Sequence, residues 1–193
     1  MKNWIIGGLI AVTGLTATGL VIGSQYEREY GERGEHEGYG YRYGIKRQDV
    51  ASVNSALYKQ ECGSCHFAYQ PGLLPAASWW KLMDGLADHF GENAELDADT
   101  LKQLREYLTM NAADQVNRGR SPRIVNSLRG DIPLRITDTV YFRRQHHEIP
   151  MRMVKNNPEV GSFSRCEVCH AGANEGFYDE DSVRIPGMGR WED

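Results

Sequence analysis

The spacing of hydrophobic residues predicts a mainly α-helical chain. Apolar residues recur every three or four positions over residues 78–90, again after Asp97, and over a short stretch within residues 139–150. Residues 118–193 otherwise show little periodicity and contain five of the seven prolines. We therefore expect regular helices in the first half and a loop-rich second half with few short helices.

The N-terminal residues have the pattern of an exported protein. Lys2 precedes an uncharged run over residues 4–23, which would span about 30 Å as a helix. Residues 1–23 are therefore predicted to be either a signal peptide cleaved before Ser24 or a membrane anchor, and both fit. Residues 24–47 are rich in Tyr, Gly, Glu and Arg without apolar periodicity, so they are predicted to form a flexible linker.

Composition excludes several classes of protein. Four cysteines among 193 residues are too few for a disulfide-built scaffold. A net charge of -4, from 26 acidic and 22 basic residues, argues against a nucleic-acid-binding protein. Only 40% of the residues are hydrophobic, and part of that fraction lies in the N-terminal run. A non-protein group is therefore expected to fill part of the interior.

The four cysteines fall into two copies of the pattern C-x-x-C-H, which is the attachment pattern of c-type haem. In this pattern two thiols one helical turn apart bind the two vinyl groups of a porphyrin, and the next residue presents an imidazole to the iron. The predicted cofactor-binding residues are Cys62, Cys65 and His66 in one copy and Cys166, Cys169 and His170 in the other. Two covalently bound haem c groups follow from this interpretation.

Other uses of the cysteines fit less well. A zinc site would need C-x-x-C pairs much closer together than the hundred residues between Cys65 and Cys166. A thioredoxin-like motif would not explain the histidine that follows each pair. A disulfide within a C-x-x-C pair would close only a tiny loop and stabilise little.

The sixth iron ligand decides between electron transfer and chemistry at an open position. We expect a helix over residues 78–90, with Ser78 as N-cap and Gly91 as stop, that places His89 on the edge of its apolar stripe. His89 is therefore the predicted metal ligand at the first haem, with Met83 as the fallback. The alternative for His89 is a core histidine paired with a backbone carbonyl.

The second distal ligand is sought in residues 139–150, a short helical stretch that Pro150 ends. Adjacent residues of a helix point about 100° apart, so His146 and His147 cannot both face one haem. His146 shares a face with Phe142, so it is the predicted metal ligand. His147 lies on a more polar side and remains the alternative.

The motifs together resemble the bacterial periplasmic dihaem cytochrome c family. The resemblance covers roughly residues 48–193 and is carried by YKQECGSCHFAYQPGLLPAASWWKLMDGLADHFGENA, HHEIP, EVGSFSRCEVCHAGANEG and VRIPGMGRW. It implies a cytochrome-c-like helical haem domain over residues 48–117 and a loop-rich second haem domain over residues 118–193. It also implies bis-histidine ligation, with His89 and the first histidine of H-x-E-I-P, His146, as distal ligands.

The resemblance implies an electron-transfer protein that is not an enzyme. Expected partners are a donor such as a membrane cytochrome b and an acceptor such as a small monohaem cytochrome, with membrane contact only through residues 1–23 if they are retained. The expected location is the periplasm, with the chain either soluble or anchored to the inner membrane. The alternative is a small dihaem oxidoreductase or peroxidase with one open iron position.

Overall fold

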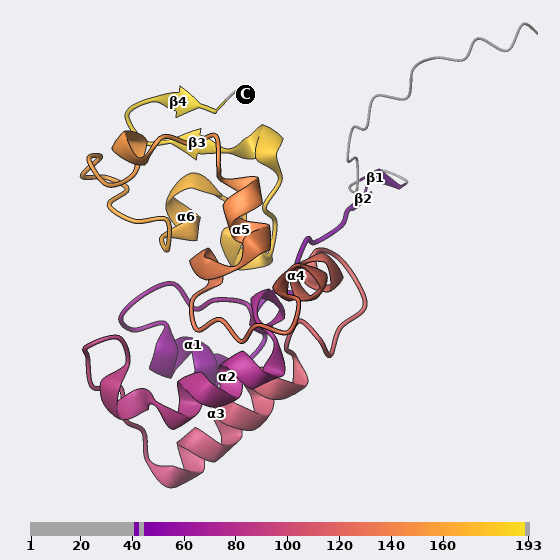
Figure 1. Ribbon diagram of the computed structural model, residues 1–193, viewed down its shortest axis with the longest axis vertical. Coiled ribbons are helices and arrows are strands. Elements are labelled where there is room, and N and C mark those ends of the chain that lie inside the picture. Colours follow the sequence, from indigo (N-terminus) through magenta and orange to yellow (C-terminus); the bar gives the residue numbers. More distant parts are fainter. Residues whose placement is uncertain (1–40, 43–44, 192–193) are drawn as a thin grey trace, which may run out of the picture. The chain divides into compact units, whose positions relative to one another are not determined.

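The computed structural model describes residues 41–42 and 45–191. The described residues are mainly helical with few strands, as the sequence predicts (Figure 1). The predicted export segment over residues 1–23 and most of the predicted linker lie outside the described residues. Among the residues that are described, no helix is long and apolar enough to cross a membrane.

The first half contains three α-helices separated by loops and 3-10 turns. They are α1 (Ala56–Cys62), η1 (Pro71–Leu73), α2 (Ala76–Asp84), η2 (Leu86–Asp88) and α3 (Ala98–Met110). Asp97 caps α3 by accepting hydrogen bonds from the backbone N–H groups of Asp99 and Thr100. Leu104 and Leu108 of this helix are buried and pack with Trp79 and Met83 of α2. The helices α2 and α3 thus enclose the largest hydrophobic cluster of the described chain.

The second half is irregular, in agreement with its prolines. Its elements are α4 (Ser121–Leu128), η3 (Ile136–Asp138), α5 (Val140–Gln145), η4 (Met151–Met153), α6 (Cys166–Cys169), η5 (Ala173–Glu175), η6 (Glu180–Ser182), β3 (Arg184–Ile185) and β4 (Gly189–Arg190). Its own cluster of buried residues is small, with Val154, Val160 and Ile185 as members. The helix α4 is not predicted by apolar periodicity, although Pro122 at its start is a usual helix-opening signal.

The structure has a shorter helix than the one predicted over residues 78–90, and this helix begins earlier. Pro75 is the N-cap of α2, and Ser78 is fully buried inside the helix. Gly85 is the C-cap, and its N–H donates to the carbonyl oxygens of Lys81 and Leu82. The prediction of Ser78 as the cap is therefore wrong. Because a glycine in a helix is about 1 kcal/mol less favourable than alanine, Gly85 ends the regular helix despite the continuing apolar spacing.

The predicted linker differs from the structure at its C-terminal end. Two-residue strands β1 (Tyr41–Arg42) and β2 (Ile45–Lys46) pair in antiparallel fashion, where the sequence predicts no strand. Contacts also cross the boundary predicted between residues 117 and 118. The backbone N–H of Arg120 donates to Asp49 O, and the Ser121 hydroxyl donates to Gly72 O. The two segments that carry the C-x-x-C-H motifs therefore pack on each other, and their division into domains stays a prediction.

Candidate functional site

The first C-x-x-C-H motif begins at the last residue of α1. Ser55 caps this helix by accepting a hydrogen bond from Tyr58 N–H. The buried Tyr58 ring packs the helix against the hydrophobic cluster of α2 and α3, which we call the first core. Cys62 also packs on this core, and burial raises the pKa of its thiol to about 11. Cys65 is exposed.

The structure brings the rings of His66 and His89 close together. Their ring centroids are 6.2 Å apart and their planes differ by 19°. A metal–imidazole bond is about 2 Å long, so two imidazoles on opposite sides of one metal have centroids about 6 Å apart. His66 Nδ1 donates to Phe67 O at 2.8 Å, which leaves Nε2 free to bind a metal. The arrangement fits one metal between the two rings.

A tight turn after α2, rather than a helix face, orients His89. The 3-10 turn η2 ends at His89, whose N–H donates to Glu92 O at 2.7 Å. Phe90 follows in the left-handed region with φ 61°, and the Arg135 guanidinium lies 3.7 Å from its ring centroid. The prediction that His89 lies on a helical stripe is wrong, although the residue still faces His66. The fallback residue Met83 is buried in the first core.

The second C-x-x-C-H motif forms the short helix α6 and ends at His170. The His170 N–H donates to Cys166 O at 2.9 Å. Burial raises the pKa of Cys166 to about 12 and raises that of Cys169. Arg165 holds the start of the motif by donating to the carbonyl oxygens of Glu159 and Val160, both at 3.1 Å.

His146 lies opposite His170 with the same spacing as the first pair. The ring centroids are 6.1 Å apart, and the planes differ by 80°. His146 is the C-cap residue of α5 rather than part of the helix, and its Nδ1 donates to Phe142 O at 2.9 Å. The Phe142 ring stacks on it with centroids 3.9 Å apart. Backbone and ring contacts thus fix the orientation of His146 and leave its Nε2 free.

Burial favours the neutral form of the imidazoles of His89, His146 and His170. It lowers the pKa of His170 to about 4, assisted by His146 and Arg120, and it is also the main cause of the lowered pKa of His146. Burial, followed by the charges of His66 and Arg135, lowers the pKa of His89. Because only the neutral imidazole binds a metal, this environment suits metal ligation at neutral pH.

His147 is not brought to either pair. Its side chain is 69% exposed, its Nδ1 donates to Arg144 O, and its Nε2 lies 3.6 Å from a Glu148 carboxylate oxygen. Of the two adjacent histidines, therefore, only His146 faces a C-x-x-C-H histidine.

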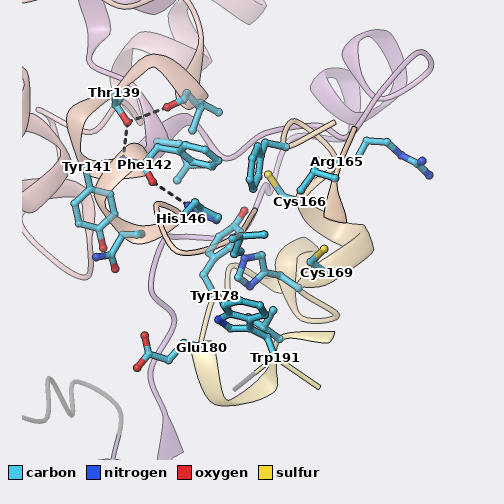
Figure 2. Close-up of a pocket in the computed structure, with 18 of the residues that line it drawn as sticks. Thr139, Tyr141, Phe142, His146, Arg165, Cys166, Cys169, Tyr178, Glu180 and Trp191 are labelled. Atoms are coloured by element: carbon cyan, nitrogen blue, oxygen red, sulfur yellow. Dashed lines mark hydrogen bonds between the residues drawn. The ribbon is translucent and has the colours of Figure 1, made fainter. Parts of the chain in front are cut away.

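An apolar cavity surrounds the second histidine pair (Figure 2). Its apolar lining comes from both halves of the chain and includes Val50, Leu73, Ile124, Phe142, Phe163 and Trp191. Inside, the buried His170 Nδ1 has no hydrogen-bond partner among the described residues. A large apolar group that carries a metal between His146 and His170 fits this cavity.

Two tyrosines, one from each half of the chain, connect the two histidine pairs. Tyr69 packs on His66 with centroids 5.2 Å apart, and its hydroxyl donates to Ser164 O beside the second motif. Tyr178 packs edge-on against His170 with centroids 5.3 Å apart, and its hydroxyl donates to the side-chain oxygen of Gln70. Each motif histidine is therefore supported by a tyrosine that is anchored in the other half.

Gln70 is the polar centre of this connection. It is fully buried, and its side-chain amide nitrogen donates to Ala173 O while its oxygen accepts from Tyr178. We predict that Gln70→Ala lowers the free energy of unfolding by about 2–4 kcal/mol, because it leaves a small cavity and two buried groups without partners. Denaturant titration of the haem-loaded protein measures this change. The exposed Gln60→Ala is the control, and equal stabilities of the two variants would contradict the prediction.

Sequence reasoning missed a second connection, formed by Asp49 and Arg120. Arg120 Nε donates to one Asp49 carboxylate oxygen at 2.9 Å, and the other oxygen accepts from Tyr178 N–H at 2.7 Å. Arg120 also donates to the Tyr141 hydroxyl at 3.1 Å and lines the cavity. The carboxylate and the hydroxyl that face it hold the pKa of the guanidinium above its usual value despite burial. Partners 71 residues apart leave no local signal in the sequence.

Comparison with known proteins gives consistent matches. The family model described as dihaem cytochrome c matches residues 58–178. The X-ray structure of a dihaem cytochrome c from Shewanella baltica OS155 is 44% identical, with a TM-score of 0.59 over 71% of this chain and 97% of that one. A dihaem cytochrome c from Rhodobacter sphaeroides is 41% identical, with a TM-score of 0.60 over 67% of this chain and 100% of that one. No curated protein matches the chain.

Proposed function

Because the chain belongs to the dihaem cytochrome c family, we propose that it is an exported electron carrier in which each haem lies between two histidines. Two covalently bound haem c groups follow from this membership. When bound, the haem irons supply one-electron redox chemistry. The protein's part is to hold the groups, fix the ligand rings and limit access of water.

The proposed attachment residues are those of the two motifs. Cys62 and Cys65 would hold one haem, and Cys166 and Cys169 would hold the other. The proposed axial pairs are His66 with His89 and His170 with His146. The observation that carries the proposal is the spacing of these pairs, 6.2 Å and 6.1 Å between ring centroids.

Two histidines at each iron favour an electron carrier over an enzyme. An enzyme that acts on a small molecule at the iron needs an open or weakly held position. The imidazoles of His66 and His146 are oriented by hydrogen bonds to backbone carbonyl groups, which makes them fixed ligands. Nothing in the described residues favours the alternative of a peroxidase-like centre.

The proposed setting is the periplasm, with residues 1–23 as signal or anchor. The proposed partners are a membrane cytochrome b as electron donor and a small monohaem cytochrome as acceptor. These proposals rest on the export pattern of the N-terminal residues and on the family resemblance.

Electron paramagnetic resonance combined with a redox titration tests the proposal. We expect two low-spin ferric haems in the oxidised protein, two reversible one-electron steps, and no binding of carbon monoxide by the reduced protein. Bis-histidine ligation should also place both potentials below those of cytochromes with a methionine ligand. A high-spin haem, or rapid binding of carbon monoxide, would instead support the enzyme with an open iron position.

A further inference from the structure

Charge is distributed unevenly between the two proposed haem-binding segments. Residues 118–165 carry ten arginines and lysines against four aspartates and glutamates, whereas residues 48–117 carry four against ten. Nine of the ten cations in residues 118–165 are arginines. The modest net charge of the whole chain therefore conceals a strongly basic stretch that contains His146 and a strongly acidic one that contains His89.

Four of these cations flank His146 along the chain. Arg143 and Arg144 belong to α5, which ends at His146, and Arg152 and Lys155 follow in and after η4. We call residues 143–155 the basic segment. Its two parts are held together because Ile149 N–H donates to His146 O and Lys155 N–H donates to Met151 O. Cations thus precede and follow the residue that faces His170.

These four side chains are available to a partner. All four residues are exposed, and none forms an ion pair with another described residue. None of them lines the cavity around His146, so a haem in that cavity would not cover them. Met151 lies between them in sequence and is also exposed, at 49%. Arginine and methionine are enriched in protein interfaces, so the composition is that of a docking surface.

The geometry argues for a protein rather than a membrane. A helix that binds a lipid surface needs a free apolar face that enters the bilayer. The helix α5 has only six residues, and its aromatic residues Tyr141 and Phe142 line the cavity instead (Figure 2). The basic segment therefore offers charge with little apolar surface to insert.

The acidic stretch near His89 would direct the same partner away from the first site. The exposed carboxylates there are Asp84, Asp88, Glu92, Glu95, Asp97 and Asp99. An acidic partner is repelled by this stretch and attracted by the basic segment, and such opposed effects generate specificity. The two histidine pairs are thus distinguished electrostatically.

We propose that the basic segment, residues 143–155, is the docking surface for an acidic redox protein, which meets the molecule beside the second histidine pair. The inference rests on the proposed electron-transfer function. It adds to that function the site and the charge of one partner.

The test uses the haem-loaded protein and a bacterial flavodoxin, an acidic one-electron carrier, as the probe. In the test variant, Arg143, Arg144, Arg152 and Lys155 are replaced by Gln. In the matched control, the exposed Lys81, Lys102, Arg184 and Arg190 are replaced by Gln, which changes the net charge equally. Calorimetry at low ionic strength should show affinity at least about tenfold weaker for the test variant and changed less than about twofold for the control.

Equal losses in the two variants would overturn the proposal, because net charge alone would then account for binding. Tighter binding to phosphatidylglycerol vesicles than to flavodoxin, lost in the same test variant, would overturn it in favour of a membrane surface. Unchanged affinity in a variant that still carries two low-spin haems and both redox steps would refute the docking site but leave the electron-carrier function intact.

Discussion

Replacing His146 by alanine is expected to convert one of the two haems from low spin to high spin, whereas replacing His147 by alanine is expected to change neither. The two residues are adjacent, but only His146 lies with its ring 6.1 Å from that of His170. His147 is largely exposed and contacts Arg144 and Glu148. The pair is therefore a matched test of ligand assignment, since each variant removes one imidazole from the same short segment.

Electron paramagnetic resonance of the oxidised variants makes the measurement. His146→Ala should show one high-spin and one low-spin ferric signal of equal weight, and the reduced variant should bind one carbon monoxide per molecule. Added imidazole should restore the low-spin signal, which loss of folding would not allow. A high-spin signal in His147→Ala, with none in His146→Ala, would show that the neighbouring residue is the ligand.

The sequence predicted His89 and His146 for reasons that the structure only partly shares. Helical periodicity placed His89 on a helix face, but the regular helix ends at Gly85 and a backbone bridge to Glu92 orients the ring. The spacing of apolar residues shows which positions are buried, but it does not show where a turn changes the direction of the chain. Both histidines nevertheless lie close to a motif histidine, with ring centroids 6.2 Å and 6.1 Å apart.

Connections between distant segments had no counterpart in the sequence. Tyr178 and Gln70 are 108 residues apart in the sequence, which is far more than the length of any local motif. Their hydrogen bond depends on how the two halves pack. The cavity around His146 likewise takes Val50 and Leu73 from the first half. The uneven charge is visible in the sequence, but the net charge of -4 conceals it. The structure adds that four of the cations are exposed in the segment that contains His146.

The largest effect on stability is expected from removing the second haem attachment. The buried cluster of the first half has eight residues, including Leu104 and Leu108, whereas that of the second half has three. A covalently held haem would therefore provide much of the second interior. We predict that Cys166→Ala with Cys169→Ala lowers the free energy of unfolding by more than about 4 kcal/mol, as expected when a tightly bound group is lost.

The matched variant, Cys62→Ala with Cys65→Ala, should be less destabilised, because contacts between α2 and α3 themselves form much of the buried cluster of the first half. Mass spectrometry of each denatured double variant should find one covalent haem in place of two, which verifies that the intended group is lost. Denaturant titration then compares the stabilities. Equal losses, or a greater loss for the first motif, would mean that protein contacts such as those of Gln70 and Arg120, rather than the haem, hold the second half together.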